Sequence, residues 1–143
     1  MNGSVNPAVV RLAPGESLPP WLRALDAAVF GDAWGDPAAQ EAVWMVEGAA
    51  FARWSVLRLA GEAELLRIAV DPARRGEGLA RALLAAAEAE LAPLGIRDLH
   101  LEVRVSNAAA RRLYEACGWD PSGLRKAYYR DGEDAALYGK RLG

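Results

Sequence analysis

The sequence predicts an α/β protein with a mixed, mostly antiparallel sheet, one parallel strand pair at its centre and helices on both faces. The main observation is the order strand, glycine-rich turn, helix, strand, helix over residues 64–118, which is a βαβ unit with parallel strands. The second is a hairpin signal on each side of that unit. The third is length: 143 residues suit one domain, and we expect residues 1–143 to form it.

Ahead of the βαβ unit the sequence predicts a strand, two helices and a hairpin: residues 8–12, 21–30, 36–43, and 44–46 paired with 50–59 across Glu47-Gly48. The 21–30 segment places its apolar residues on one helical face and is followed by Gly31, a common helix end. Asp36-Pro37 is a capping residue followed by proline, and it predicts a short helix to about Val43.

The βαβ unit begins with Leu65 to Val70, an apolar and partly β-branched run that is typical of a buried strand. Asp71-Pro72 ends this strand, because proline donates no ladder hydrogen bond and restricts the residue before it. The glycine-rich turn then leads into a helix that ends at Leu91. The second strand, Leu99 to Val103, alternates apolar and polar residues.

After the second strand, Ser106-Asn107 is typical of a helix cap and predicts a helix that ends at Cys117-Gly118. Asp131-Gly132 is a strong hairpin signal between two further runs, Leu124 to Tyr129 and Ala135 to Leu142. We therefore expect the last part of the chain to form an antiparallel strand pair.

Composition and charge narrow the class of protein. Hydrophobic residues at 52% and charged residues at 25% are ordinary for a soluble domain, and the net charge of −2 argues against a broad nucleic-acid surface. No apolar run reaches the ~18 residues of a membrane helix, and Met1 to Ala13 lacks the layout of a signal peptide. One cysteine suits a reducing compartment, and one histidine with one cysteine cannot supply a metal site. We expect a cytoplasmic protein without metal, membrane or direct nucleic-acid partner; its oligomeric state is open.

The turn Arg74-Arg75-Gly76-Glu77-Gly78 carries the clearest chemical signal. Glycine lets the backbone come close to a ligand, and N–H groups at a helix start bind phosphate oxygens. Arg74, Arg75 and Arg81 add positive charge around the turn. Two other phosphate loops are excluded, because the turn contains neither Gly-x-x-x-x-Gly-Lys-Ser/Thr nor Gly-x-Gly-x-x-Gly.

The segment Arg75-Gly76-Glu77-Gly78-Leu79-Ala80 resembles the Gln/Arg-x-x-Gly-x-Gly/Ala loop of the GNAT family of acetyl-CoA-dependent N-acetyltransferases. Further motifs over roughly the last 80 residues resemble its RimI branch, the ribosomal-protein-alanine N-acetyltransferases: Ile-Ala-Val-Asp-Pro (68–72), Leu-Glu-Val-Arg (101–104), Ser-Asn-Ala-Ala-Ala (106–110), Leu-Tyr-Glu (113–115), Gly118-Trp119, Arg125 with Tyr128-Tyr129, and Glu133-Asp134-Ala135. Ala80 stands where that branch usually has glycine, and the first 63 residues match loosely.

The resemblance implies the GNAT fold, with acetyl-CoA as a co-substrate. It also implies that Ile68, Ala69 and Val70 pair with the pantetheine arm, and that Asn107 contacts the cofactor. The residues that it assigns to the diphosphate are Arg75, Gly76, Glu77, Gly78, Leu79, Ala80 and Arg81. If the first strand carries a bulge, its backbone N–H groups are the donors for a developing oxyanion.

Acetyl transfer to an amine needs a base for the ammonium proton and an acid for the leaving thiolate. Glu102 lies at the end of a central strand, where ligands bind to α/β sheets, and Tyr114, two helical turns after Asn107, has a phenol proton to give. From the residues alone, Glu102 could equally pair with Arg104, Asn107 could be a plain N-cap, and Tyr114 a core aromatic. The resemblance implies that Glu102 is the base and Tyr114 the acid.

For the acceptor, the resemblance implies the N-terminal amine of a partner protein, an alanine-starting small-subunit ribosomal protein. Trp34, Tyr128 and Tyr129 are the candidates for its binding. A lysine side chain or a small amine is the nearest alternative. A non-catalytic acyl-CoA-binding sensor is another, and the presence of Glu102 and Tyr114 speaks against it.

Overall fold

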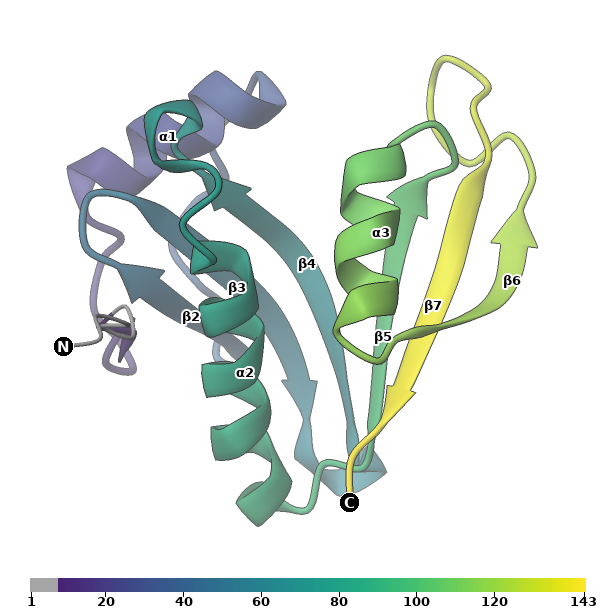
Figure 1. Ribbon diagram of the computed structural model, residues 1–143. Coiled ribbons are helices and arrows are strands. Elements are labelled where there is room, and N and C mark those ends of the chain that lie inside the picture. The colour runs from purple at the N-terminus through teal and green to yellow at the C-terminus, as the bar shows by residue number, and fades with distance from the viewer. Residues whose placement is uncertain (1–7) are drawn as a thin grey trace, which may run out of the picture.

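The structure is a computed structural model that describes residues 8–143, so the first part of the Met1–Ala13 stretch lies outside the described residues. Seven strands form one sheet in the order β1-β2-β3-β4-β5-β7-β6 (Figure 1). Their bounds are β1 Val10–Arg11, β2 Glu41–Val46, β3 Ala50–Leu57, β4 Glu62–Val70, β5 Asp98–Arg104, β6 Asp120–Arg125 and β7 Ala135–Arg141. The helices are α1 Pro20–Phe30, α2 Leu79–Leu91 and α3 Ala108–Ala116, with short 3₁₀ turns at Arg58–Ala60, Pro72–Arg74 and Ala92–Leu94.

The predicted mixed sheet with helices on both faces is confirmed. Strands β4 and β5 are parallel, and the other neighbouring pairs are antiparallel. Helices α2 and α3 pack on one face, over a large apolar cluster that includes Trp54, Leu83 and Leu99 (Figure 1). Helix α1 covers the opposite face, where Leu22 packs with Phe51 in a smaller cluster.

The two parallel strands separate halfway along their length. Their ladder runs from Glu62 opposite Asp98 to Leu65 opposite Leu101, and beyond that point β4 and β5 diverge toward their carboxyl ends (Figure 1). Because the ladder stops, the edge of β4 that faces β5 has no strand partner after Leu65. This opening lies where ligands bind in α/β sheets.

A β-bulge lies at the same place, on the side of β4 that pairs with β3. Arg53 of β3 is opposite Arg67 whereas the next residue, Trp54, is opposite Leu65, so Leu66 is the extra residue. An extra residue reverses the alternation of side chains along a strand. Accordingly Leu65 packs under α2 and α3, whereas Ala69 packs against the α1 cluster. Ile68 is the strand neighbour of Ala69, so its side chain points to the opposite face, toward α2 and α3.

Both helices that follow the parallel strands begin as the sequence predicts. Gly78 is the N-cap residue of α2 with φ +77°, a left-handed conformation that favours glycine. The Asn107 side chain accepts a hydrogen bond from the Ala110 N–H at 3.1 Å, which confirms Asn107 as the N-cap of α3.

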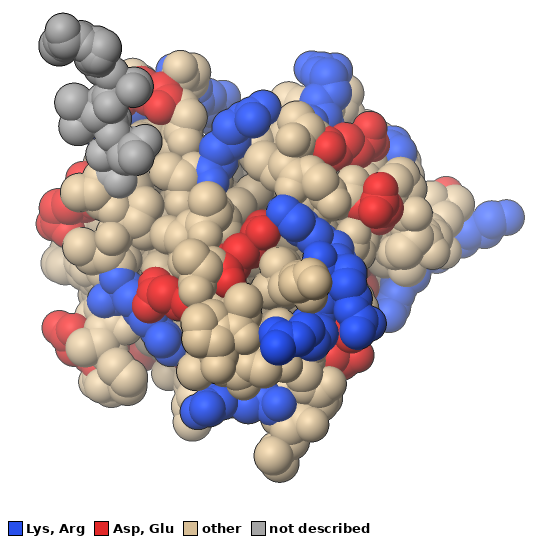
Figure 2. Space-filling model, turned by 60° about the horizontal axis from the view of Figure 1, so that its bottom comes forward, with Lys and Arg blue, Asp and Glu red and all other residues tan. Residues whose placement is uncertain are grey.

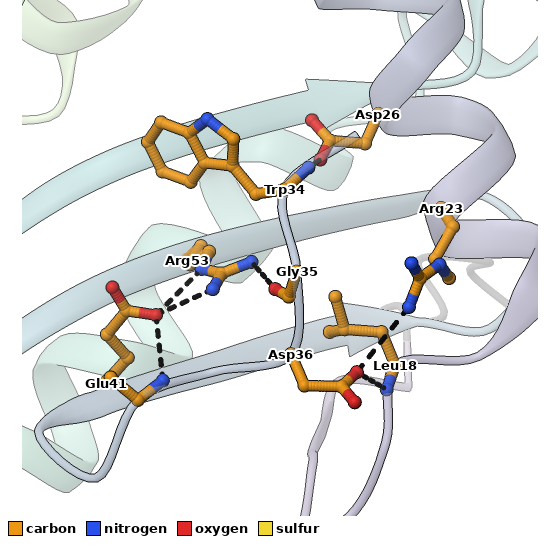
Figure 3. Close-up of polar contacts among 9 residues, drawn as sticks. Leu18, Arg23, Asp26, Trp34, Gly35, Asp36, Glu41 and Arg53 are labelled. Carbon is orange, nitrogen blue, oxygen red and sulfur yellow. Dashed lines mark hydrogen bonds and ion pairs between the residues drawn. The ribbon is translucent and has the colours of Figure 1, made fainter. Parts of the chain in front are cut away.

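The helix predicted over 36–43 is wrong. Residues 36–40 form a loop and β2 follows, because the Asp36 carboxylate accepts from the Leu18 N–H at 2.9 Å instead of capping a helix (Figure 3). The Glu41 carboxylate likewise accepts from Ala38 N–H and from Arg53 (Figure 3). The residues after it alternate between the two core clusters, with Trp44 in one and Met45 in the other, as strand residues do.

The late hairpin is confirmed, but its first strand lies earlier than predicted. β6 ends at Arg125 opposite Ala135, so Tyr128 and Tyr129 lie in the loop between β6 and β7 and not in a strand. Ala127 has a positive φ of 52°, and its N–H donates to Asp134, so the chain turns before the tyrosines. The predicted two-residue turn at Asp131-Gly132 is thus part of a longer loop over 126–134.

No helix within residues 8–143 is long and apolar enough to cross a membrane. On the face shown in Figure 2, basic side chains form a run near the centre and acidic side chains border it. The two signs are intermixed there, as expected from a net charge of −2.

Candidate active site

A cavity of about 410 Å³ lies between the carboxyl half of β4, the turn after it, and the starts of α2 and α3. We call it the turn cavity. Its lining residues are Ile68, Ala69, Val70, Arg74, Arg75, Gly76, Gly78, Leu79, Ala80, Arg81, Ala109, Ala110, Leu113 and Tyr114. The structure therefore brings together most of the residues predicted to hold the cofactor.

The glycine-rich turn presents main-chain N–H groups to this cavity. Gly76 and Gly78 have φ values of +84° and +77°, and a Cβ placed on either would meet nothing within 4 Å, so the space in front of the turn is open. The Ala82 N–H donates to the Gly78 carbonyl at 3.0 Å, and the N–H groups before it are not used within α2. Such a helix start, with its positive dipole end, suits phosphate oxygens.

The charged residues of the turn divide into two kinds. Arg75 and Arg81 are exposed and line the turn cavity, which leaves their charges available to an anion. Arg74 also lines it, but its Nε lies 2.9 Å from Glu77 Oε2, and this hydrogen bond lowers the pKa of the Glu77 carboxyl. Glu77, a predicted cofactor residue, is not among the lining residues and is turned to Arg74 instead.

A second cavity, of about 540 Å³, opens where β4 and β5 separate. We call it the loop cavity, because the end of α1 and the β6–β7 loop contribute to it. Its lining residues are Val29, Phe30, Leu65, Leu66, Arg67, Ile68, Leu101, Glu102, Val103, Arg104, Asn107, Ala110, Tyr114 and Tyr129.

The two cavities meet at three shared residues, Ile68, Ala110 and Tyr114. Tyr114 is 5% exposed, and it packs against Trp119 and Tyr138 at ring-centre distances of 6.1 and 6.3 Å. Burial, followed by the neighbouring Tyr129 and Cys117, raises the pKa of Tyr114 to about 12. Its hydroxyl is therefore protonated at neutral pH and can act as a proton donor.

Glu102 of β5 and Tyr114 of α3 both line the loop cavity. The Oε1 atom of Glu102 lies 3.5 Å from Arg125 Nε, and the nearby Glu102 carboxylate raises the pKa of Tyr128. The alternative interpretation, a pair with Arg104, is wrong, because Arg104 binds Asp131 and Glu133 at 2.9 Å each. Glu102 thus keeps a partly open carboxylate beside the cavity.

The predicted acceptor residues lie in three different positions. Tyr129 lines the loop cavity and stacks under Arg104, whose Cζ is 4.1 Å from the ring centre. Tyr128 does not line either cavity; it lies against Arg125, whose Cζ is 5.5 Å from its ring centre, and the Glu102 carboxylate raises its pKa. Trp34 lies behind the wall of the cavity, against Arg67. Asn107 lines the loop cavity and not the turn cavity, so its cofactor role stays a prediction.

Sequence reasoning missed several lining residues. Ala110 and Leu113 of α3 carry a readable signal, because Ala110 shares the helical face of Tyr114 at a spacing of four residues and Leu113 neighbours Ala110 at a spacing of three. Arg104 could be noticed as the last residue of the second strand. Phe30 and Arg67 carry no such signal, because only the packing of α1 and the bulge bring them to the cavity.

Comparisons with known proteins agree with this geometry. The profile of the Acetyltransferase (GNAT) family matches residues 7–119. The [ribosomal protein bS18]-alanine N-acetyltransferase of Escherichia coli is 47% identical over 78 residues, which are 53% of this chain and 53% of that one. The chain thus spans about half the length of the curated relatives it matches.

Two solved structures extend the likeness to the fold. The ribosomal-protein-S18-alanine N-acetyltransferase from Escherichia coli superposes with a TM-score of 0.76 at 32% identity, covering 95% of both chains. A streptothricin acetyltransferase homologue from Bacillus anthracis, solved with acetyl coenzyme A, has a TM-score of 0.66 at 20% identity over 76% of this chain and 66% of that one, and shows the fold alone. The chain belongs to the Acetyltransferase (GNAT) family.

Proposed function

We propose that this protein transfers the acetyl group of acetyl-CoA to the N-terminal amine of a protein, an alanine-starting ribosomal protein in the first instance. The observation that carries the proposal is the meeting of the turn cavity and the loop cavity at Tyr114, with Glu102 also lining the loop cavity. One cavity has the properties of a phosphate site and the other contains a carboxylate and a protonated phenol. A two-substrate transfer needs such an arrangement.

The turn cavity fits acetyl-CoA as the donor substrate. The unused N–H groups at the start of α2, with Arg75 and Arg81, would hold the diphosphate. The unpaired edge of β4 beyond Leu65, at Ile68 and Val70, would run beside the pantetheine arm and offer N–H donors.

The reaction would follow from the two groups at the junction. Glu102, directly or through water, takes a proton from the acceptor ammonium, and the neutral amine attacks the thioester carbonyl carbon. Main-chain N–H groups of β4 stabilise the oxyanion. As the C–N bond forms and the C–S bond breaks, Tyr114 gives its proton to the departing sulfur. The nitrogen releases its second proton, which restores the Tyr114 phenol through solvent, and an amide and free CoA remain.

The acceptor class rests on the named relatives, which act on an alanine N-terminus of ribosomal protein bS18. The loop cavity supports a chain end, because it is open between α1 and the β6–β7 loop and its floor ends at Glu102. Such an acceptor would place the reaction in the cytoplasm. A lysine side chain or a small amine is the alternative, since the chemistry at the junction is the same.

The proposal is tested by turnover of acetyl-CoA with short peptides that begin with alanine, compared with free lysine and polyamines. We expect peptide turnover to be the fastest and the product to carry acetyl on its N-terminal nitrogen by mass spectrometry. Preference for a side-chain amine or a polyamine would overturn the assigned acceptor. Binding of acetyl-CoA without turnover of any amine would favour a sensor.

A further inference from the structure

Two arginines lie directly opposite each other on the α1 face of the sheet, Arg53 of β3 and Arg67 of β4. Like charges in this position repel each other and need compensation. The Trp34 ring lies against both guanidinium groups, with centroid distances of 5.3 Å to Arg53 and 3.9 Å to Arg67. Trp34, a loop residue, thus packs on two neighbouring positive charges in the middle of the sheet. The presence of two such charges there needs a structural or functional explanation.

Arg67 reaches this face because of the bulge at Leu66. In a regular strand Arg67 would share the face of Leu65, under α2 and α3. The extra residue turns it to α1, where it pairs with Asp26, a residue that is 1% exposed. The bulge therefore serves both sides of β4: it directs Ile68 to the turn cavity and Arg67 to the buried carboxylate.

Asp26 joins three elements with its two oxygens. Its Oδ1 accepts from Arg67 Nη1 of β4 at 2.7 Å, and its Oδ2 accepts from the Trp34 N–H at 2.9 Å (Figure 3 shows the Trp34 contact). Arg67 also donates to the Asp32 carbonyl at 3.1 Å and to the Asp32 carboxylate at 2.9 Å. Together these contacts fix residues 31–34, which connect α1 to the loop before β2.

The same guanidinium forms part of the wall of the loop cavity. Its Cζ lies 4.5 Å from the centre of the Phe30 ring, and Arg67, Phe30 and Val29 all line the cavity. Phe30 and Val29 are apolar yet 42% and 37% exposed, so their positions depend on Arg67 more than on the core. Both Nη1 and Nη2 of Arg67 already donate to Asp26 or Asp32, and its side chain is only 12% exposed, so it is not a free cation for a ligand.

We propose that Arg67, held by the buried carboxylate of Asp26, is a positioning residue that sets the α1 wall of the acceptor site through Phe30 and Trp34. This inference rests on the proposed function, because it takes the loop cavity as the site of the amine acceptor. It assigns a role to Arg67 and Asp26, for which no role follows from the family resemblance.

The test compares Arg67→Gln, Arg67→Lys and Asp26→Asn with the wild-type protein, and uses Arg141→Gln as the charge-matched control. Arg141 pairs with Asp98 at the far end of the sheet, and its side chain is 73% exposed. KM for an alanine-starting peptide and KM for acetyl-CoA are measured separately, together with Tm. Hydrogen exchange of the Trp34 amide reports the position of the loop without any acceptor.

For Arg67→Gln we expect peptide KM to rise about ten-fold or more while KM for acetyl-CoA stays within about two-fold. Arg67→Lys keeps a charge for Asp26 but loses the planar stacking and the second donor, so peptide KM rises about three-fold with Tm nearly unchanged. The Trp34 amide exchanges faster in Arg67→Gln and Asp26→Asn, and Arg141→Gln leaves all these values unchanged.

Unchanged peptide KM in a folded variant, or an equal rise in both KM values, would overturn the inference. If Arg67→Gln does not fold, Arg67→Lys decides by the same criteria. If the wild-type protein acetylates no amine, the proposed function fails by itself, and the exchange of the Trp34 amide decides the positioning role. Retained protection of that amide in Arg67→Gln and Asp26→Asn would then refute it.

Discussion

The turn cavity and the loop cavity meet at Tyr114, yet different kinds of chemical groups line them. The turn cavity offers main-chain N–H groups at the start of α2 and small side chains such as Ala80 and Ala109. The loop cavity offers side chains, among them Glu102 and Tyr129, which loops and ion pairs hold in place. A nucleotide substrate that is the same in all relatives can be bound by main-chain groups. An acceptor that differs between relatives is better bound by side chains, because amino-acid substitution can change them.

The loop cavity itself has two walls of unequal strength. Arg67 fixes the α1 wall from a nearly buried position, 12% exposed, opposite the buried Asp26. Arg104 fixes the β6–β7 wall from a position that is 41% exposed, through Asp131 and Glu133. Salt screens exposed pairs and leaves buried ones nearly untouched. The α1 wall is therefore held as part of the core. The β6–β7 wall depends on exposed ion pairs and is adjustable.

Substitutions of Glu102 and Tyr114, where the two cavities meet, should slow acetyl transfer without weakening the binding of either substrate. Glu102→Gln and Tyr114→Phe are each expected to lower kcat by about 10² or more, because each removes a proton transfer and leaves the cavities in shape. Steady-state kinetics gives kcat, and calorimetric titration with CoA gives the affinity. Unchanged turnover in either variant would remove that residue from the mechanism.

The burial of Tyr114 should appear as a pH-dependent stability. Its pKa is about 12 in the folded protein and about 10 in an unfolded chain, so the folded state holds the proton more tightly. This contribution is complete below pH 10 and is lost as the pH rises through 12, a loss of about 2–3 kcal/mol in the free energy of unfolding.

Urea unfolding at pH 9 and near pH 12 measures this loss, with Tyr114→Phe as the reference that lacks the titrating group. The stability difference between wild type and Tyr114→Phe should shrink toward the higher pH. Parallel pH profiles for the two proteins would mean that the hydroxyl reaches solvent when the protein is folded.

On the turn side, Gly78→Val should weaken acetyl-CoA binding about ten-fold, because a β-branched residue at φ +77° strains the turn by about 1–2 kcal/mol. Peptide KM should not change. Gly95→Val is the matched control, since Gly95 also has a positive φ, +88°, and open space around it but ends a 3₁₀ turn remote from both cavities. Equal losses of affinity in the two variants would show that general destabilisation is the cause.

The smallest effect is expected at the adjustable wall. Arg104→Gln should raise peptide KM by about three-fold, as exposed ion pairs contribute up to about 1 kcal/mol. Raising the salt concentration should also increase the peptide KM of the wild-type protein, because salt screens the same ion pairs. The peptide KM of Arg104→Gln should increase less. A salt response that is equal in both proteins would contradict the assignment of this wall to Arg104.

The sequence was sufficient for features with local signals. The βαβ unit could be predicted because Asp71-Pro72, the glycine turn and the Asn107 cap each mark a boundary by their own backbone chemistry. Most of the turn cavity could be predicted for the same reason, since the majority of its lining residues lie between Ile68 and Arg81. The hairpins followed from turn residues, although the loop before β7 is longer than Asp131-Gly132 suggests.

Features that depend on distant partners could not be predicted. Asp36 looks like a helix cap but serves the Leu18 N–H, which only the folded chain brings near (Figure 3). The bulge at Leu66 has no local signature, and without it Arg67 would be assigned to the wrong face. The loop cavity is therefore the part of the site that sequence reasoning described least well, because its walls come from five separate parts of the chain: α1, β4, β5, α3 and the β6–β7 loop.

The surplus residue in β4 also constrains how this enzyme can be engineered. Chimeras exchange segments between relatives and are usually joined inside well-aligned strands. By sequence alone, the Leu65–Val70 stretch would be chosen as such a joining point. A join that drops one residue there would let β4 pair regularly with β3, and every side chain after it would trade sides. This strand therefore has to be transplanted whole.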